Sequence, residues 1–385
     1  MKRLAIVSTH PVQYNAPIFR SLASYGKLDV KVFYTWEQSK EAVFDPGFGK
    51  VITWDIPLLD GYAYEFSKNK SGTKKSKSFW SIQNPTLIQD IKTYNADAIL
   101  VIGWNYASHL QVMRYFKGRV PVFFRGDSTL LNERKGWRQL IRRFLLTQIY
   151  KYVDIVLYVG SANKAYYLKH GLKESQLVYA PHAIDNARFG TESVEAIAWA
   201  AGTRDKLGIP AEAKVFLFAG KLEPVKNPEL LLSAFTCLTD KEPHLIIVGN
   251  GKLEGNLKAK YKKYPNIHFI DFQNQSLMPA VYRMADVFVL GSDSETWGLA
   301  VNEAMACGRA VLVSDKVGCA ADLVQVGRNG FIFKAGDKED LLNKLNELRN
   351  YPKATLTEMG RASAEIIKNW NYTIICNAIL DKLGD

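Results

Sequence analysis

Residues 287–303 read Val-Phe-Val-Leu-Gly-Ser-Asp-Ser-Glu-Thr-Trp-Gly-Leu-Ala-Val-Asn-Glu, and this stretch decides the fold. Four apolar residues predict a buried strand at Val287–Leu290, a polar turn follows, and a helix begins near Gly298. A short apolar strand that leads into a helix is the repeating unit of a parallel α/β sheet. The stretch therefore predicts a doubly wound parallel sheet in this half of the chain.

The same alternation continues in both directions. In the first half we expect strands at Leu4–Ser8, Val30–Tyr34, Ala98–Ile102, Val120–Phe124, Ile155–Val159 and Leu177–Ala180, with helices at Ala16–Tyr25, Tyr106–Phe116, Trp137–Tyr152 and Ala162–His170. In the second half we expect strands at Val215–Ala219, Leu245–Val248, Ile267–Ile270, Val287–Leu290, Ala310–Val313 and Phe331–Phe333, with helices at Pro228–Leu238, Leu253–Tyr261, Leu277–Met284, Ala300–Cys307, Lys338–Arg349 and Trp370–Leu383. A break after Asp185 and a linker at residues 186–192 separate the two series.

The length and composition agree with two ordinary α/β domains. The chain has 385 residues, of which 47% are hydrophobic, and the prior for one domain is about 100–200 residues. The first apolar run, Leu4–Val7, is too short for a signal peptide, and a membrane-spanning helix needs about 20 apolar residues. We therefore expect a soluble, cytoplasmic protein. The cysteines form no CxxC pair and no histidines stand at i, i+4, so we expect no metal site.

The charge of the chain is distributed unevenly. Residues 1–190 hold 27 Lys+Arg and 14 Asp+Glu, a net charge of +13, whereas the rest of the chain carries −1. The positive charge therefore predicts an anionic partner for the first domain only.

Two glycine-containing turns follow predicted strands of the second domain. The first holds Gly220, Lys221 and Lys226, so that two cations stand at the carboxyl end of a strand, where a diphosphate would find charge and helix N–H groups. The second holds Gly249 and Gly251, which permit a ligand to approach the backbone closely. Each turn alone is also compatible with an ordinary surface loop.

The opening stretch contains two glutamates that flank a predicted helix start. Glu295 precedes the helix and Glu303 lies about one turn inside it, while the amides between them are typical of an anion site. A carboxylate accepts hydrogen bonds from sugar hydroxyls and repels phosphate. We therefore expect Glu303 to hold a ribose diol, Glu295 to hold a second sugar, and the amides and lysines to hold a diphosphate between them.

These segments together resemble a known family. Phe218–Phe235 is similar to the G-[RK]-L-x3-K-x5-LL-x-AF segment of retaining GT-B glycosyltransferases of family 4 (glycosyl transferases group 1), and Glu295–Glu303 matches their E-x7-E motif. Pro181–Phe189 resembles the closing segment of their first domain, and Val317–Phe331 resembles the stretch after the second glutamate. The resemblance implies two Rossmann-like domains facing across a cleft. It places an acceptor-binding domain at residues 1–190, a donor-binding domain at 191–365, and a helix at 366–385 that returns to the first domain.

The resemblance also implies roles for individual residues and a retaining, metal-independent transfer that uses a UDP- or GDP-sugar and no cofactor. Lys221 and Lys226 neutralise the donor diphosphate, Glu295 binds the transferred sugar and Glu303 binds the ribose. The backbone between these glutamates binds the phosphates, at positions Thr296, Trp297, Gly298, Leu299 and Ala300. The base is held near Phe272, between Asp271 and Gln273. At the position of Lys221 an arginine is commoner in the family. The lysine ammonium is a compact point charge and does not offer the bidentate contact of an arginine guanidinium.

The first domain departs from the family pattern. Its first strand leads into His10, Gln13 and Tyr14 instead of a glycine-rich loop, and His10 either faces the cleft or caps a rigid turn. Many relatives carry a histidine after the strand at Val120–Phe124, where this chain has Arg125. Arg125 either takes that catalytic place or contacts an anionic acceptor. Further candidates on the acceptor side are Asp127 and Trp104.

A basic segment at residues 114–151 holds ten Lys/Arg and a predicted helix with an apolar stripe that begins at Trp137. Such a helix suits an anionic membrane surface, although it also suits a helix packed on the core. We therefore hypothesise docking on the inner face of the cytoplasmic membrane to reach a glycan or lipid-linked acceptor, as in bacterial polysaccharide or cell-surface glycan synthesis. The alternatives are a sugar-nucleotide epimerase or phosphorylase of the same fold, and a basic nucleic-acid-binding protein. We do not expect a nucleic-acid partner, because no aromatic platform or recognition motif accompanies the charge.

Overall fold

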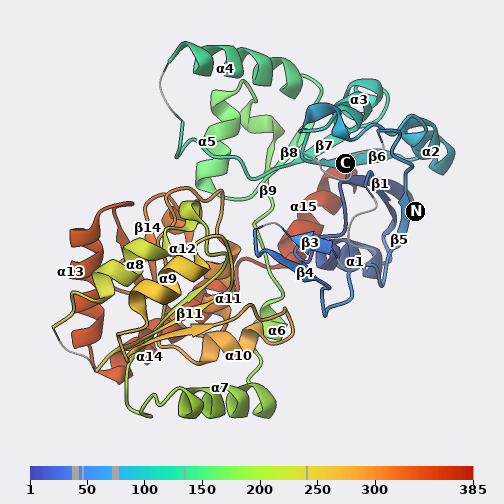
Figure 1. The fold of residues 1–385 in the computed structure, drawn as a ribbon. Coiled ribbons are helices and arrows are strands. Elements are labelled where there is room, and N and C mark those ends of the chain that lie inside the picture. Colours follow the sequence, from blue (N-terminus) through green and yellow to red (C-terminus); the bar gives the residue numbers. More distant parts are fainter. Residues whose placement is uncertain (37–42, 46, 72–77, 134–135, 240–241, 385) are drawn as a thin grey trace. The chain divides into compact units, whose positions relative to one another are not determined.

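The computed structural model describes all residues except 37–42, 46, 72–77, 134–135, 240–241 and 385. The chain forms two compact units (Figure 1). Unit 1 comprises residues 1–43, 56–182 and 372–385, and unit 2 comprises residues 44–55 and 183–371.

Unit 1 is built on a parallel sheet that has seven strands among the described residues, in the order β5-β2-β1-β6-β7-β8-β9. Its strands are β1 (Lys2–Ser8), β2 (Leu28–Tyr34), β5 (Ala63–Phe66), β6 (Ala98–Ile102), β7 (Val122–Arg125), β8 (Ile155–Tyr158) and β9 (Leu177–Tyr179). Its helices are α1 (Ala16–Ser24), α2 (Leu87–Tyr94), α3 (Ala107–Phe116), α4 (Trp137–Tyr150), α5 (Ser161–Lys169) and α15 (Tyr372–Gly384), with short 3₁₀ turns at Phe79–Ser81 and Glu174–Gln176.

Unit 2 has a second parallel sheet, with six strands among the described residues, in the order β12-β11-β10-β13-β14-β15. These are β10 (Val215–Ala219), β11 (His244–Val248), β12 (Ile267–Ile270), β13 (Val287–Leu290), β14 (Ala310–Ser314) and β15 (Gly330–Phe333). Its helices are α6 (Asn186–Gly190), α7 (Val194–Lys206), α8 (Pro228–Phe235), α9 (Glu254–Tyr261), α10 (Met278–Arg283), α11 (Leu299–Ala306), α12 (Ala320–Leu323), α13 (Lys338–Asn350) and α14 (Lys353–Ile367), with a 3₁₀ turn at Pro224–Lys226. The strand pair β3 (Val43–Asp45) and β4 (Lys50–Ile52) forms a separate small sheet.

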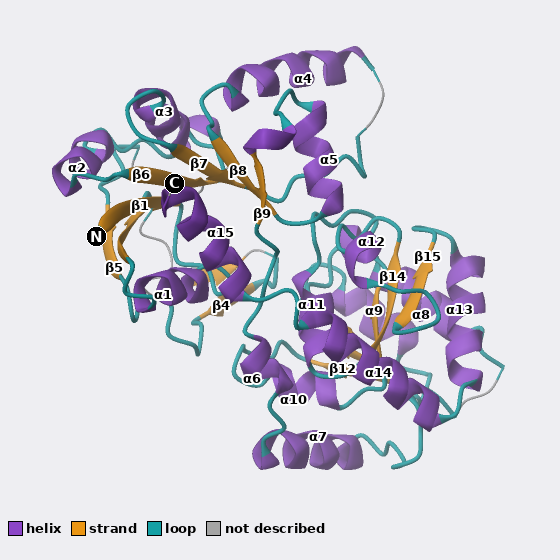
Figure 2. Cartoon of the chain, turned by 180° about the vertical axis from the view of Figure 1, so that it is seen from behind, coloured by secondary structure: helices purple, strands orange, loops and turns teal. Residues whose placement is uncertain are grey.

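Helices flank each sheet (Figure 2). They cover the central strands, and the burial of these strands explains their sequence. Every residue of β10 and of β13 is buried, so both strands are continuous apolar runs without a polar alternation. Local signals set the helix starts. Asn227 takes a left-handed conformation and its side chain accepts a hydrogen bond from Leu230 N, while Pro228 occupies the first helical position of α8.

In both sheets the strand order reverses once, and this feature positions the site. The reversal lies between β1 and β6 in unit 1 and between β10 and β13 in unit 2. In doubly wound sheets, ligands bind at the carboxyl ends of the strands beside such a switch point. The loops after β1, β6, β10 and β13 are therefore the expected ligand-binding loops.

The doubly wound two-sheet fold predicted from the sequence is confirmed, although strands β3, β4 and β5 and helices α2, α6, α7, α12 and α14 are not among the predicted elements. Residues 186–192 are not a plain linker, because Asn186–Gly190 forms α6, capped by an Asp185 side chain that accepts from Arg188 N. The compact units divide after His182 and after Asn371, whereas the predicted domain limits were 190 and 365. In the sequence, residues 44–55 lie between β2 and β5, which are strands of unit 1, but they belong to unit 2.

Candidate donor-binding site

The predicted donor residues of unit 2 follow four neighbouring strands, and all lie at the carboxyl edge of its sheet. Gly220 and Lys221 follow β10, Gly249 and Gly251 follow β11, and Phe272 follows β12. The stretch from Glu295 to Ala300 lies between β13 and the first turn of α11. Because these strands are parallel, their four loops meet at one edge, on both sides of the switch point between β10 and β13.

Side-chain contacts join the loops on the two sides of this switch point. Lys226, which follows β10, forms an ion pair with Glu295, which follows β13. Beside it, Asn227 Nδ2 donates to the Asp293 carboxylate at 3.1 Å, and Asp293 N donates to Val225 O at 2.9 Å. Glu295 and Lys226 are therefore neighbours in the folded chain. Glu295 is predicted to bind a sugar, and Lys226 is predicted to neutralise phosphate.

The backbone that carries Glu295 is held from a second side by the segment after β14. Glu295 N donates to Lys316 O at 3.1 Å, and Gly318 N donates to Glu295 O at 3.1 Å. Gly318 permits this approach, because a Cβ atom at that position would lie 1.9 Å from Thr296 O. The sequence similarity at residues 317–331 thus corresponds to a structural support for the loop that carries Glu295.

Gly298 sets the start of α11. Its φ of 97° is a conformation that favours glycine, and a Cβ atom there would lie 2.8 Å from a methyl group of Val317. The indole of Trp297 is 2% exposed and donates to Asn302 Oδ1 at 2.9 Å, so this side chain anchors the turn. The amides that follow lie at a helix N-terminus, where they favour an anion.

Glu303 is a buried carboxylate. It is 2% exposed, and its Oε2 accepts a hydrogen bond of 2.7 Å from the Tyr282 hydroxyl of α10. This bond fixes the orientation of the carboxylate and offsets part of the cost of burying its charge. Nothing in the sequence pattern singled out Tyr282, because its position depends on how α10 packs against α11.

Asn250 joins the loops after β11 and β12. Its side chain accepts from Phe272 N at 2.7 Å and donates to Asp271 Oδ1 at 3.1 Å. Hydrogen bonds from Asn250 and Lys258 lower the pKa of Asp271. The flanking glycines are required by space, since a Cβ atom at Gly249 would lie 2.1 Å from Gly220 O. Sequence reasoning selected these glycines but missed the asparagine between them.

In unit 1, the predicted residues His10 and Trp104 flank the other switch point, after β1 and β6 respectively. His10 is half-buried, its Nδ1 lies 3.0 Å from Thr9 Oγ1, and burial lowers its pKa. Gln13 and Tyr14 are also half-buried and precede α1. These positions are compatible with acceptor binding, which stays a prediction.

The buried residue His109 joins loops near the same switch point, and nothing in the sequence pattern singled it out. His109 Nδ1 donates to Gly103 O at 2.8 Å and its Nε2 accepts from Thr35 Oγ1 at 2.9 Å. Burial lowers the pKa of His109 to about 4, so the ring is neutral and its two nitrogens join the loops around it.

Arg125 is a buried residue that binds backbone carbonyl groups of unit 1. It is 5% exposed, and its guanidinium donates to Ala180 O at 2.7 Å and to Pro181 O at 2.9 Å. Burial lowers its pKa to about 10. Asp127 is half-buried beside it, and its charge acts on Arg125 and on His182. A catalytic role for Arg125 stays a prediction, and the two carbonyl contacts give a different reason for an arginine at this position.

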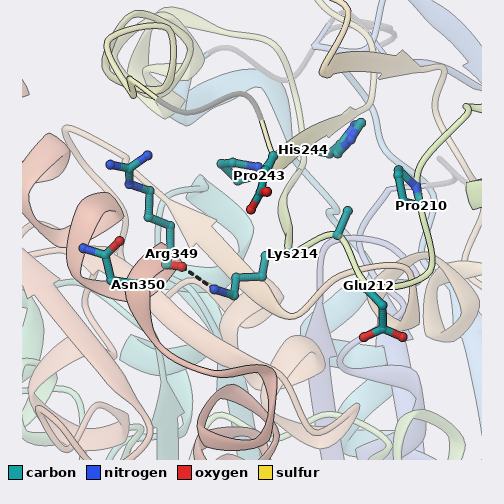
Figure 3. Close-up of a pocket in the computed structure, with 9 residues that line it drawn as sticks. Pro210, Glu212, Lys214, Pro243, His244, Arg349 and Asn350 are labelled. Atoms are coloured by element: carbon teal, nitrogen blue, oxygen red, sulfur yellow. Dashed lines mark hydrogen bonds between the residues drawn. The ribbon is translucent and has the colours of Figure 1, made fainter.

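A cavity of about 600 Å³ lies at the opposite edge of the unit 2 sheet (Figure 3). Lys214 precedes β10 and His244 begins β11, so this cavity opens at the amino ends of the strands. Its lining includes two acidic side chains, Glu212 and Glu242, beside Lys214 and Arg349. None of the predicted donor residues lines it, and its mixed charge favours no particular ligand.

Comparison with known proteins agrees with this geometry. Residues 201–365 match the family model described as glycosyl transferases group 1. The D-inositol 3-phosphate glycosyltransferase of Streptomyces avermitilis is 31% identical over 195 residues, which cover 47% of this chain and 42% of that protein. The sulfoquinovosyl transferase SQD2 of Arabidopsis thaliana is 32% identical over 164 residues, 42% of this chain and 31% of that protein. The chain thus spans less than half the length of the curated relatives it matches.

Solved structures extend the similarity to the whole chain at the level of the fold. Sucrose-phosphate synthase from Thermosynechococcus elongatus superimposes with a TM-score of 0.74 at 19% identity, covering 99% of this chain and 98% of that one. Anabaena Alr3699/HepE in complex with UDP and glucose superimposes with a TM-score of 0.72 at 17% identity over the full length of both chains. Residues 201–365 are therefore similar to the glycosyl transferases group 1 family, and the chain as a whole has the GT-B fold.

Proposed function

We propose that the protein is a retaining glycosyltransferase that moves a sugar from a UDP- or GDP-sugar to a glycan or lipid-linked acceptor. The observation that carries this proposal is the convergence of Lys221, Lys226, Glu295 and Glu303 at the carboxyl edge of one sheet, beside its switch point. The relatives support the class, since the Streptomyces avermitilis protein is named a glycosyltransferase, SQD2 is named a sulfoquinovosyl transferase, and HepE has been solved with UDP and glucose.

In this proposal the donor lies along the edge of the sheet from β12 to α11. The base lies near Phe272, Glu303 accepts hydrogen bonds from the ribose diol, and the diphosphate lies between the lysines and the first turn of α11. The bond from the anomeric carbon to the diphosphate oxygen breaks, the acceptor oxygen bonds to that carbon on the same face, and the proton of the acceptor hydroxyl passes to the departing diphosphate oxygen. The lysines stabilise the charge on the departing diphosphate, and the proposal calls for no metal ion.

The ion pair between Lys226 and Glu295 gives the donor site a defined state before the donor binds. Each charge is neutralised by the other while both side chains stay partly exposed, at 25% and 18% respectively. A bound diphosphate competes for the ammonium of Lys226, which leaves Glu295 to accept hydrogen bonds from the sugar hydroxyls. When the donor binds, Lys226 and Glu295 thus exchange their ion pair for contacts with the diphosphate and the sugar. Neither side chain has to become ordered from a disordered state.

The experiment that tests this function is a turnover assay with UDP-, GDP-, ADP- and dTDP-sugars. We expect one donor class to release its nucleoside diphosphate and to leave a product whose anomeric configuration, measured by NMR, equals that of the donor. An inverted product would contradict the retaining mechanism. Appearance of an epimeric sugar nucleotide without any acceptor would favour the alternative of an epimerase.

We also propose that α4 brings the enzyme to an anionic membrane that holds a lipid-linked acceptor, at the cytoplasmic face where sugar nucleotides are available. Figure 1 draws α4 at the outer edge of unit 1, beside α5. Five large apolar side chains of this helix are at least half exposed: Trp137 67%, Leu140 67%, Ile141 50%, Phe144 64% and Leu145 53%. The sequence left open whether this stripe packs on the core, and in the structure it does not.

The apolar stripe of α4 lies on the side of the helix opposite its packing face. At about 100° per residue, its five residues fall within an arc of roughly 140°, and the buried Leu146 and Tyr150 lie on the other side. Arg138, Arg142 and Arg143 are exposed beside this arc, so the apolar face is flanked by positive charge. Helices of this kind bind in the plane of an anionic membrane surface. Arg134 and Lys135, part of the same basic segment, lie outside the described residues.

No helix in the described ranges is long and apolar enough to cross a bilayer, so the proposal for α4 concerns surface binding. We expect the protein to float with vesicles that contain phosphatidylglycerol and not with phosphatidylcholine vesicles. The double variant L140S/F144S should reduce binding at least tenfold, and Arg142→Gln about fivefold, at ~1 kcal/mol per cation. Val194→Ser, at a residue of unit 2 that is 78% exposed, is the matched control. Equal flotation of L140S/F144S and the wild type would contradict the proposal.

A further inference from the structure

Residues 44–55 belong to unit 2 although they lie in the N-terminal half of the sequence. Their C-terminal end is fixed to the loop between β12 and α10. Asn274 Nδ2 donates to Thr53 O at 2.7 Å, and Ser276 N donates to Asp55 Oδ1 at 3.0 Å. Further along the segment, Lys50 Nζ lies 3.7 Å from Asp271 Oδ2. The segment is therefore attached to the same loops that form the predicted base end of the donor site.

Phe48 of this segment touches two of the predicted donor residues. Its ring lies edge to face with the ring of Phe272, with centroids 4.7 Å apart and an interplanar angle of 60°. The ammonium of Lys221 lies over the same ring, 4.8 Å from its centroid. One aromatic side chain thus links the lysine after β10 with the aromatic residue after β12.

The backbone beside Phe48 packs closely on the same lysine. Gly47 is buried, and a Cβ atom at this position would lie 2.7 Å from both Cδ and Nζ of Lys221. A glycine at position 47 therefore lets the segment lie directly against the lysine side chain. Lys221 is confined from one side by Gly47 and from another by the ring of Phe48.

We propose that Phe48 is a positioning residue of the donor site, which holds the ammonium of Lys221 in place for the donor diphosphate. This inference rests on the proposed function, because it assigns Phe48 to the site where the nucleotide sugar binds. The ring offers its negative face to the cation and leaves the ammonium hydrogens on the other side directed away from the ring. Phe48 contributes no atom to the reaction and acts through Lys221.

The direction of the effect follows from the entropy of the lysine side chain. A free lysine loses rotamer freedom when it binds phosphate, and a lysine already held over an aromatic ring loses less. Phe48 therefore strengthens binding of the diphosphate. The opposite model, in which Phe48 is a strap that must leave before the donor enters, predicts tighter binding once the ring is removed.

The test is calorimetric binding of UDP and GDP, each compared with its nucleoside, to the full chain. We expect Phe48→Leu to weaken the nucleoside diphosphate that binds the wild type about fivefold, the scale of one exposed cation–π contact. Binding of the phosphate-free nucleoside should change less than twofold. Phe48→Tyr, which keeps the ring, should bind as the wild type does. Val51→Ala, at a residue of β4 that is 64% exposed, should also leave binding unchanged.

The outcomes separate this inference from the proposed function. If neither UDP nor GDP binds the wild type, the proposed function fails. If one binds and Phe48→Leu binds it equally well or more tightly, the positioning role of Phe48 is wrong and the function stands. An equal loss for nucleoside and diphosphate contradicts an action through Lys221. Unchanged thermal unfolding of Phe48→Leu verifies that the variant folds.

Discussion

Tyr282 contacts Glu303, the carboxylate that is predicted to bind the ribose of the donor. Its hydroxyl donates to the buried carboxylate of Glu303 at 2.7 Å. A hydrogen bond to a charged group contributes about 1.5–3 kcal/mol, so Tyr282→Phe should lower thermal stability and weaken nucleoside diphosphate binding about tenfold. Tyr351→Phe removes a similar bond, of 2.9 Å to Glu347, away from the predicted donor residues. An equal loss of affinity in both variants would show that Tyr282 has no specific role.

Lys226 is predicted to stabilise the leaving group, and this role can be tested in steady-state kinetics. Loss of one such contact costs about 3 kcal/mol, or roughly a hundredfold in kcat, so Lys226→Ala should show this decrease with an unchanged fold. Lys344→Ala removes a comparable ion pair, with Glu347 on α13, and should keep full turnover. Wild-type kcat in Lys226→Ala would contradict the assigned role.

Both members of the pair Lys226–Glu295 could be selected from the sequence, but their contact could not. The residues are separated by 69 positions, and the ion pair depends on the strand order that places β13 beside β10. For the same reason Tyr282, Asn250 and Phe48 carried no signal: each acts through a neighbour supplied by another strand or helix. Local patterns reveal residues beside strand ends and helix starts, whereas their partners are set by tertiary packing.

At the scale of elements, the loop that carries Glu295 depends on close backbone packing at Gly318. A Cβ atom at this glycine would lie 1.9 Å from Thr296 O, and backbone atoms cannot yield as a flexible side chain can. Gly318→Ala should therefore lower the melting temperature and abolish nucleoside diphosphate binding. Gly255→Ala is the control, because its Cβ would meet nothing within 4 Å in helix α9. Normal binding by Gly318→Ala would show that this loop tolerates displacement.

Most central elements could be predicted because their burial makes them continuous apolar runs, as in β10 and β13. The edge strand β5 could not, since its residues are exposed or half-buried and show no apolar alternation. For α4 the stripe was visible, but a stripe packed on the core and a stripe facing outward have the same sequence pattern. Only the exposure of its side chains distinguishes them.

At the scale of the whole molecule, buried histidines make stability depend on pH. The pKa of His109 is lowered to about 4 by burial, against 6.5 for an exposed histidine. Between these values the unfolded chain binds a proton that the folded chain does not, so stability falls as pH decreases from about 6.5 to about 4. Burial lowers the pKa values of His182 and His268 to about 4 as well, with the same sign.

We therefore expect urea unfolding to show a loss of stability between pH 7 and pH 5, of which His109 accounts for about 2 kcal/mol. The variant His109→Asn keeps a donor for Gly103 O and removes the titrating group. Its stability should be lower at pH 7 and less dependent on pH than that of the wild type. Parallel curves for variant and wild type would contradict a neutral, buried His109.

The central claim is that the carboxyl edge of the unit 2 sheet binds a nucleotide sugar, with Glu303 on the ribose. The most direct measurement is a calorimetric titration of UDP and GDP into the wild type and into Glu303→Gln. We predict that one of the two binds the wild type at a single site and that Glu303→Gln weakens it at least tenfold, a loss of about 1.4 kcal/mol or more. Equal affinity for the wild type and Glu303→Gln, or no binding of either nucleotide to the wild type, would contradict the claim.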